Sequence, residues 1–245
     1  MRMHWIQHVP FEDLGTIDSW AQSRGYRVTS TIAFTEAYPD VSLIDWLVVM
    51  GGSMGVNDEA RHPWLVAEKR YVSQTIEAGK RVLGVCLGAQ IVAEALGGSV
   101  HLNPEPEIGW YPVHLTPEGR ESATLSELPR EFVAGHWHAD TFDLPPHVSS
   151  AAVSAACGNQ AFEYDGRVWG LQFHLEWDEE AVGRLVAYCA DDLGSGTYIQ
   201  SVEELLGEPS RFAQSARLLH RLLDAMDGVA GVDLAGPQTR AAARV

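Results

Sequence analysis

The length and composition of the chain limit what it can be. At about 150 residues per domain, its 245 residues favour one large domain with an extension. Hydrophobic residues make up 46% of the chain and charged residues 20%, which is the balance of a folded globular protein. Asp and Glu number 33 against 17 Lys and Arg, and the resulting net charge of −16 argues against binding to nucleic acid or to an anionic membrane.

The cysteines and the first residues indicate a cytoplasmic protein. Cys86, Cys157 and Cys189 are odd in number, widely separated and form no CxxC pair, so neither a disulfide framework nor a structural zinc site is expected. Pro10 interrupts the N-terminal residues before an apolar signal region develops, and no run approaches the ~18 apolar residues of a membrane span.

The first part of the chain alternates short apolar runs with helical patterns. The runs predict buried strands at residues 28–33, 46–50 and 82–85, and the patterns between them predict helices at residues 14–24 and 64–78. Val, Leu and Ile occur in these strands without polar alternation, as in parallel sheets covered on both faces. The sequence therefore predicts an α/β fold with a doubly wound, mainly parallel sheet.

The pattern changes after residue 98. Strand-like segments at residues 111–115, 148–153, 160–164 and 168–173 are joined by Pro, Gly and Asp turns, which predicts added antiparallel strands. Helices are predicted at residues 178–190, 202–206 and 210–226, with apolar stripes that cover the protein's own core, and residues 228–245 are expected to be a loose tail. We divide the chain into a domain of residues 1–195 and a helical extension of residues 196–245.

The sharpest local motif is a nucleophile elbow at Gly84-Val85-Cys86-Leu87-Gly88, between the predicted strand at 82–85 and a helix at 89–96. The glycines flanking Cys86 allow a sharp turn that a neighbouring Cβ would obstruct. The turn exposes the thiol at a helix N-terminus, whose dipole favours the thiolate. By itself the motif fits a small buried cysteine in a βα turn equally well.

A second motif, His174-Leu175-Glu176, ends the strand predicted at 168–173. In an extended chain, residues i and i+2 share a face. Glu176 can therefore accept a hydrogen bond from one nitrogen of His174 and orient the ring, as the third member of a catalytic triad does. An isolated His-x-Glu pair is more often merely solvated.

A third motif is the Gly51-Gly52 turn after the strand predicted at 46–50. Such a turn can direct a backbone N–H into the cleft beside the elbow. Together with the amide of Leu87, it would form a two-donor oxyanion hole. Taken alone, an ordinary tight βα turn explains the same residues.

In order and spacing, these motifs resemble those of the class I (triad) glutamine amidotransferases, and most closely the stand-alone proteins that are similar to the glutamine-hydrolysing part of GMP synthase. The resemblance extends over about residues 3–190. Besides Gly51-Gly52, it is carried by Gly84-Val85-Cys86-Leu87-Gly88-Ala89-Gln90, Glu107-Ile108-Gly109-Trp110, His136-Trp137-His138-Ala139-Asp140 and Phe173-His174-Leu175-Glu176.

The resemblance implies a flavodoxin-like sheet and a role for each matched residue. Cys86 would be the nucleophile, His174 the base and acid, and Glu176 the residue that orients His174. The amides of Gly52 and Leu87 would form the oxyanion hole. The implied substrate-binding residues are Gln90, His138 and Asp140.

Two positions depart from the family pattern. Leu175 stands where many members have Pro, which alters loop stiffness but removes no reacting group. Ala139 stands where some members have Gly between His and Asp. This second change affects how the ends of the substrate are held, so glutamine specificity is less secure than the hydrolytic triad.

The remaining candidate residues favour structural roles. His136 and His138 are spaced like metal ligands on one strand face, but no motif places a third ligand, so we expect no metal there. A further strand is predicted at the N-terminus, and His4 and His8, which lie along it, are interpreted as structural. Cys157 and Cys189 lack the elbow pattern and are expected to be small buried residues.

The motifs predict hydrolysis of glutamine to glutamate and ammonia through a glutamyl thioester, with no metal or organic cofactor. The chain has no Gly-x-x-x-x-Gly-Lys-Ser/Thr phosphate loop, so an ammonia-accepting synthetase would be a separate partner. One alternative is a free-standing hydrolase or peptidase of γ-glutamyl compounds. Another is a glutamine-binding regulatory protein without turnover, against which the intact Cys86, His174 and Glu176 argue.

Overall fold

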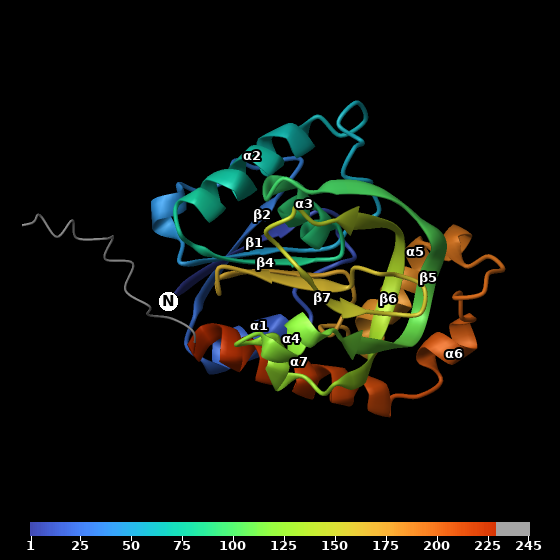
Figure 1. The fold of residues 1–245 in the computed structure, drawn as a ribbon. Helices are drawn as coiled ribbons and strands as arrows, with labels where there is room; N and C mark the ends of the chain where they lie inside the picture. Colours follow the sequence, from blue (N-terminus) through green and yellow to red (C-terminus); the bar gives the residue numbers. More distant parts are fainter. Residues whose placement is uncertain (229–245) are drawn as a thin grey trace, which may run out of the picture.

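The computed structural model describes residues 1–228, which form one mixed sheet of nine strands with helices on both faces (Figure 1). The sheet order is β2-β1-β3-β4-β9-β8-β7-β5-β6. The strands are β1 (Arg2–Gln7), β2 (Arg27–Ile32), β3 (Trp46–Val49), β4 (Arg81–Val85), β5 (Ser99–Leu115), β6 (Glu131–Asp143), β7 (Ser150–Val153), β8 (Ala161–Tyr164) and β9 (Val168–Leu171). The α-helices are α1 (Thr16–Ser23), α2 (Trp64–Glu77), α3 (Leu87–Ala95), α4 (Pro117–Glu121), α5 (Glu179–Tyr188), α6 (Val202–Leu206) and α7 (Ser210–Gly228).

The parallel part of the sheet consists of β2, β1, β3, β4 and β9, each paired in parallel with the next. β9 was predicted as one of the added antiparallel strands, but it pairs in parallel with β4 and antiparallel only with β8. Every residue of β3 and β9 is buried, which explains why their sequences show no polar alternation. The strands and helices predicted for the first 86 residues are confirmed, with boundaries that differ by one or two residues.

Helices cover the parallel strands from both sides. In Figure 1, α2 and α3 lie over one face, and α1 and α7 lie over the other. Each layer has its own buried apolar cluster: Leu65 and Val72 of α2 belong to one, whereas Trp20 of α1 and Leu219 of α7 belong to the other. Burial of both faces is the arrangement of a doubly wound sheet.

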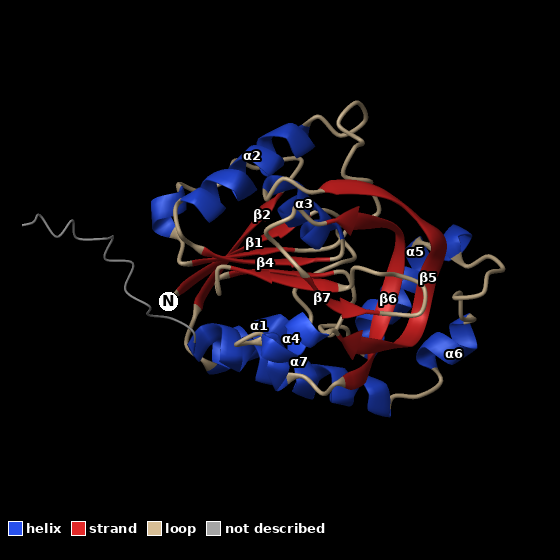
Figure 2. Cartoon of the chain, in the orientation of Figure 1, coloured by secondary structure: helices blue, strands red, loops and turns tan. Residues whose placement is uncertain are grey.

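The antiparallel part departs most from the sequence prediction. β5 is far longer than the predicted strand at 111–115, and β6 was not predicted at all. The two pair as a long curved hairpin at the edge of the sheet (Figure 2). Pro104 and Pro106 argued against a strand at these residues, because proline cannot donate a hydrogen bond to a neighbouring strand. Both fall between Leu102 and Glu107, where the pairing register shifts, so their missing N–H groups interrupt no regular ladder.

The C-terminal helices pack on the domain as the apolar stripes predicted. Leu219 and Leu222 of α7 are buried in the same cluster as Trp20, and the Trp20 indole donates a hydrogen bond to Asp224 at 2.7 Å. The division after residue 195 remains a prediction. The expected loose tail begins at residue 228, and residues 229–245 lie outside the described part of the chain.

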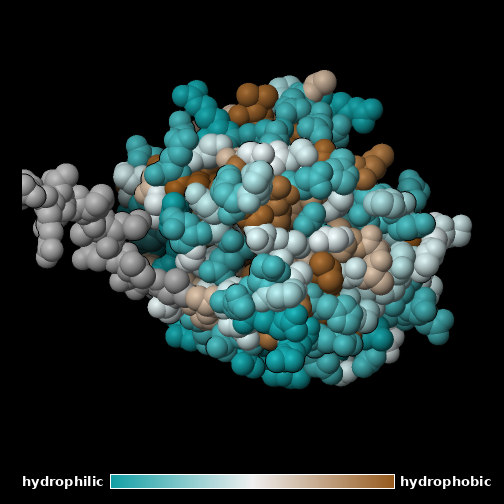
Figure 3. Space-filling view, in the orientation of Figure 1, coloured by the Kyte–Doolittle hydropathy of each residue, from teal (hydrophilic) through white to brown (hydrophobic). Residues whose placement is uncertain are grey.

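The surface is polar over most of the face drawn in Figure 3, with apolar side chains in small separate groups. Within residues 1–228, no helix combines the length and the apolar character required to cross a bilayer.

Candidate active site

Three neighbouring parallel strands end at one edge of the sheet, and each is followed by one of the predicted motifs. Gly51 follows β3, Cys86 follows β4 and His174 follows β9. The backbone N–H of Cys86 donates to Leu171, the last residue of β9, at 2.8 Å. Parallel pairing therefore brings the three motifs to the same edge of the sheet, at the position where α/β sheets commonly bind ligands.

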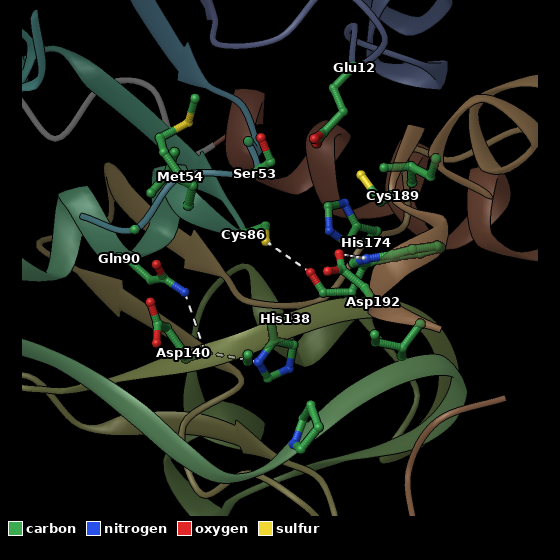
Figure 4. A pocket seen from close by; sticks show the side chains of 18 of the residues that line it. Glu12, Ser53, Met54, Cys86, Gln90, His138, Asp140, His174, Cys189 and Asp192 are labelled. Carbon is green, nitrogen blue, oxygen red and sulfur yellow. Dashed lines mark hydrogen bonds between the residues drawn. The ribbon is translucent and has the colours of Figure 1, made fainter. Parts of the chain in front are cut away.

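The motifs border a cavity of about 290 Å³ (Figure 4). Its lining includes seven of the eight residues predicted for the site, namely Gly52, Cys86, Leu87, Gln90, His138, Asp140 and His174. The eighth, Glu176, is buried directly behind His174. The structure thus gathers all the predicted site residues.

The elbow at Cys86 has the strained geometry expected of it. Cys86 has a φ of 53°, in the left-handed region that non-glycine residues rarely occupy, and it directly precedes α3. A Cβ at Gly84 would collide with the backbone of Gly88, and a Cβ at Gly88 would collide with the carbonyl of Val49. Both glycines are therefore required for close packing of backbones around the turn.

His174 is held rigidly on three sides. Its Nδ1 lies 2.5 Å from Oε1 of Glu176, whose other oxygen accepts a hydrogen bond from the Leu175 N–H at 3.0 Å. The Trp177 ring stacks on the imidazole with centroids 4.2 Å apart. The backbone of His174 exchanges two hydrogen bonds with Gly135 of β6. The free nitrogen of the ring, Nε2, is thus left for the cavity.

The surroundings of His174 favour its protonated form. Burial opposes charge on the ring, but attraction to Glu176 and hydrogen bonds to Cys86 and Glu176 outweigh it, so the pKa of His174 is well above its ordinary value. The Cys86 thiol also donates to the carbonyl of Trp137 at 3.7 Å. The pair can therefore hold an imidazolium beside a sulfur nucleophile.

The Gly51-Gly52 turn is fixed by a buried ion pair that the sequence did not reveal. His8 donates from Nδ1 to the Gly51 carbonyl at 2.9 Å and from Nε2 to Oε1 of Glu68 at 2.7 Å. Burial opposes protonation of His8, yet the charge of Glu68 and these hydrogen bonds raise its pKa. His8 is structural, as expected, but what it supports is the turn beside Cys86.

The two candidate oxyanion donors border the cavity. Leu87 is the first residue of α3, so its N–H has no partner within the helix. Gly52 is crowded: a Cβ there would lie 2.9 Å from the Cβ of His8 and 2.7 Å from Sδ of Met54. A side chain at position 52 would therefore displace the turn.

The predicted substrate-binding residues form one wall of the cavity. Nε2 of Gln90 donates to the carbonyl of Asp140 at 3.4 Å and to Oε1 of Gln172 at 3.1 Å. Nδ1 of His138 donates to the same Asp140 carbonyl at 2.9 Å (Figure 4). Burial, together with the nearby charge of Asp58, raises the pKa of the Asp140 side chain.

Glu12 also lines the cavity, and sequence reasoning missed it. Its carboxylate lies against Gly51, at a point where a Cβ would collide with it. Burial raises the pKa of Glu12, although the charges of His174 and His8 partly offset this effect. The only feature of the sequence that pointed to a role for Glu12 in the site was its position shortly after the first strand of a parallel sheet.

Two expectations about cysteines have different outcomes. Cys157 is buried, as predicted, and burial raises the pKa of its thiol. The prediction that Cys189 is buried was wrong: it is only partly buried and lines the cavity, because it caps the C-terminal end of α5 at the cavity rim.

His136 and His138 lie on one face of β6, as their spacing predicted, and Glu107 lies opposite His138 on β5. Among residues 1–228, these three form the group of His, Cys, Asp or Glu residues able to hold a metal ion. Burial lowers the pKa of His136 to about 3. The ring nitrogens of His4, in contrast, form hydrogen bonds with the hydroxyl groups of Thr29 and Thr31, which fits the structural role expected for His4.

Comparison with known proteins identifies similar chains. Residues 21–186 match the model of the family described as glutamine amidotransferase class-I. The glutamine amidotransferase-like protein YfeJ of Salmonella typhimurium is 34% identical over 232 residues, which cover 91% of this chain and 96% of YfeJ.

Two further proteins extend the comparison. The structure of a glutamine amidotransferase from Thermotoga maritima superimposes with a TM-score of 0.83 at 29% identity, over 94% of this chain and 99% of that one. A glutamine-hydrolysing GMP synthase of Aeropyrum pernix is 33% identical over 159 residues, which cover 64% of this chain but only 28% of the synthase.

Proposed function

Because the chain belongs to the class I glutamine amidotransferase family, we propose that it hydrolyses a γ-glutamyl amide through a Cys86-His174-Glu176 triad. The observation that supports this most directly is the pairing of β4 with β9, which places the elbow cysteine and the Glu-bound histidine in one cavity. The parallel strands lie in the order β2-β1-β3-β4-β9, and with β9 counted as the fifth parallel strand this is the 2-1-3-4-5 order that supports the flavodoxin-like class.

In the first half of the reaction, the Cys86 thiolate attacks the side-chain carbonyl carbon of the substrate and forms a C–S bond. The carbonyl oxygen becomes an oxyanion, which the N–H groups of Gly52 and Leu87 stabilise. The tetrahedral intermediate collapses when the C–N bond breaks, and His174 gives its proton to the departing nitrogen. With glutamine, ammonia leaves and a glutamyl thioester remains.

In the second half, the now neutral His174 accepts a proton from water as the water oxygen attacks the thioester carbon. The resulting intermediate expels the Cys86 thiolate and releases glutamate. Glu176 stabilises the imidazolium whenever it forms and holds the ring in the reactive orientation. Gln90, His138 and Asp140 form the wall against which the α-amino and α-carboxylate ends of the substrate are bound.

The direct test measures glutamate release from glutamine by the wild type and by Cys86→Ala. The wild type should turn over, and the variant should lose all turnover because no thioester can form. Calorimetry measures whether the wild type and the variant bind glutamine. Turnover by Cys86→Ala would refute the mechanism, and binding without turnover by the wild type would favour a regulatory protein.

A second candidate substrate class is favoured by the charge of the cavity. Its lining includes Glu12, Asp140 and Asp192 but no Lys or Arg among the described residues. A γ-glutamyl conjugate with a cationic amine as leaving group would be attracted by these carboxylates. Faster cleavage of such conjugates than of glutamine would identify a free-standing γ-glutamyl hydrolase.

If the protein is instead a glutaminase subunit, glutamine should be its preferred substrate. Its hydrolysis of glutamine should be slow when it is alone and should accelerate when a separate synthetase accepts the ammonia. The similarity to part of a GMP synthase supports this alternative, and adding a candidate synthetase to the glutamine assay tests it.

A further inference from the structure

The geometry points to a binding site for a divalent transition-metal ion between β5 and β6, and we propose that Glu107, His136 and His138 are its ligands. Glu107 is paired directly with His138 across the hairpin, and His136 is two residues away on the same face. Glu107 and His136 have no solvent exposure, and His138 is 5% exposed. One ligand atom from each residue lies within 4.8 Å of the other two.

The hydrogen bonds of His138 leave an electron pair directed at a carboxylate. Its Nδ1 faces the Asp140 carbonyl at 2.9 Å, and because a carbonyl only accepts, Nδ1 carries the proton. In the neutral ring, Nε2 then presents its lone pair to Oε2 of Glu107 at 3.3 Å. Two acceptors that face each other in a buried site repel unless a proton or a metal ion lies between them.

His136 strengthens the argument because its ring nitrogens lack well-aligned partners within the described residues. Nδ1 lies 3.4 Å from the same Glu107 oxygen, and the backbone of Tyr111, which also approaches the ring, is not aligned for a regular hydrogen bond. The nearby Oε1 of Glu107 is also without a partner. Buried polar atoms are rarely left in this condition, and a bound ion would occupy one nitrogen of His136 and one oxygen of Glu107 at once.

The outer contacts match those of known metal sites. Metal-bound histidines usually donate their other N–H to a carbonyl, as His138 does to Asp140, and ligating carboxylates are themselves hydrogen-bonded. Glu107 accepts from Ser154 at 3.0 Å and from Gln160 at 2.7 Å. Bonds of about 2.0–2.1 Å in a tetrahedral site separate ligand atoms by about 3.4 Å, close to both Glu107 distances.

Two nitrogens and one carboxylate oxygen suit Zn²⁺ and related ions, with a fourth position left for water. Such an ion would link β5 to β6 beside Trp137. The carbonyl of Trp137 accepts a hydrogen bond from the Cys86 thiol. The ion would brace the cavity wall without taking part in hydrolysis. No metal was expected from the sequence because no motif placed a third ligand, and Glu107 is the residue that supplies one.

The test is carried out in a Cys86→Ser background, so that the active-site thiol cannot bind metal. Protein stripped with a chelator is titrated with Zn²⁺ against a chromophoric competitor, and bound metal is counted by elemental analysis. We expect about one ion per chain and a loss of at least about tenfold in affinity for His136→Gln, as is found when metal-site contacts are removed. His4→Gln, which removes another buried imidazole, should bind like its parent.

Co²⁺ gives a readout that identifies the site. A tetrahedral N/O site should produce visible absorption without the near-ultraviolet band of a thiolate ligand, which would instead implicate Cys189. Absence of both Zn²⁺ retention and Co²⁺ absorption in the parent protein would overturn the proposal, and so would equal affinity in the parent and His136→Gln. If His136→Gln does not fold, Glu107→Gln serves the same comparison, and the parent's stoichiometry and Co²⁺ spectrum still decide the outcome.

Discussion

His8 and Glu68 form an ion pair in which neither side chain has any solvent exposure, with Nε2 2.7 Å from Oε1. The pair joins α2 to the end of β1, and His8 uses its other nitrogen to hold the Gly51 carbonyl. A contact between elements 60 residues apart thereby determines the position of the turn beside Cys86.

Removing one member of this pair should be strongly destabilising. In His8→Gln, the Glu68 carboxylate stays buried without its counterion, and such a loss costs about 3–5 kcal/mol. The double variant His8→Gln/Glu68→Gln should lose clearly less than the sum of the single losses. Urea unfolding of the four proteins measures the coupling.

The matched control is Arg24→Gln, which breaks the ion pair with Asp224. Both side chains of that pair are about half exposed, so the loss should stay below about 1 kcal/mol. Equal losses at both sites, or simple additivity of the His8 and Glu68 losses, would show that burial of the pair has no special effect.

Glu176→Gln should change the pH profile as well as the rate. Burial disfavours the protonated form of His174. The negative charge of Glu176 is the main factor that raises the pKa of His174 well above the ordinary value. The wild type should therefore keep its general acid to high pH. Without that charge the pKa falls, so the alkaline limb of kcat/KM should move to lower pH, with a fall in kcat of about 10²–10⁴.

The control for this profile is Glu180→Gln, which removes the same charge from an exposed position on α5, where the side chain is 83% exposed. Its profile should match that of the wild type. An alkaline limb that stays in place in Glu176→Gln would mean that a group other than His174 is the acid.

Gly52→Ala tests the proposed oxyanion hole. The added Cβ would crowd His8 and Met54 and displace the turn. Misplacement of one donor should lower kcat by about 10²–10³, with a smaller effect on KM, because the donor binds charge that develops in the transition state. Gly158→Ala is the control away from the cavity, since a Cβ there would have no neighbour within 4 Å. Similar kinetics for the two variants would remove Gly52 from the mechanism.

Much of the fold and site followed from local sequence. Buried parallel strands have uninterrupted apolar runs, so β3 and β4 could be predicted from the sequence. Because parallel strands end at the same edge of a sheet, the motifs that follow them had to meet there. The β5–β6 hairpin was not visible, because prolines and charged residues at the sheet edge mask the strand pattern. The partnership of Glu107 with His138 depends on the register of that hairpin, and the partnership of His8 with Glu68 depends on the packing of α2. Neither leaves a local signal.

The close approach of α3 to β3 gives the last prediction. A Cβ at Gly88 would collide with the Val49 carbonyl, and because both partners are backbone, no rotamer change relieves the contact. Gly88→Ala should therefore cost about 3 kcal/mol or more, whether or not the cysteine is active. Gly183→Ala on α5 has no neighbour within 4 Å of the new Cβ and should gain about 0.5–1 kcal/mol from helix propensity. Urea midpoints compare the two, and a Gly88→Ala protein as stable as the wild type would show that α3 can move away from β3, in which case the elbow is not held by backbone packing.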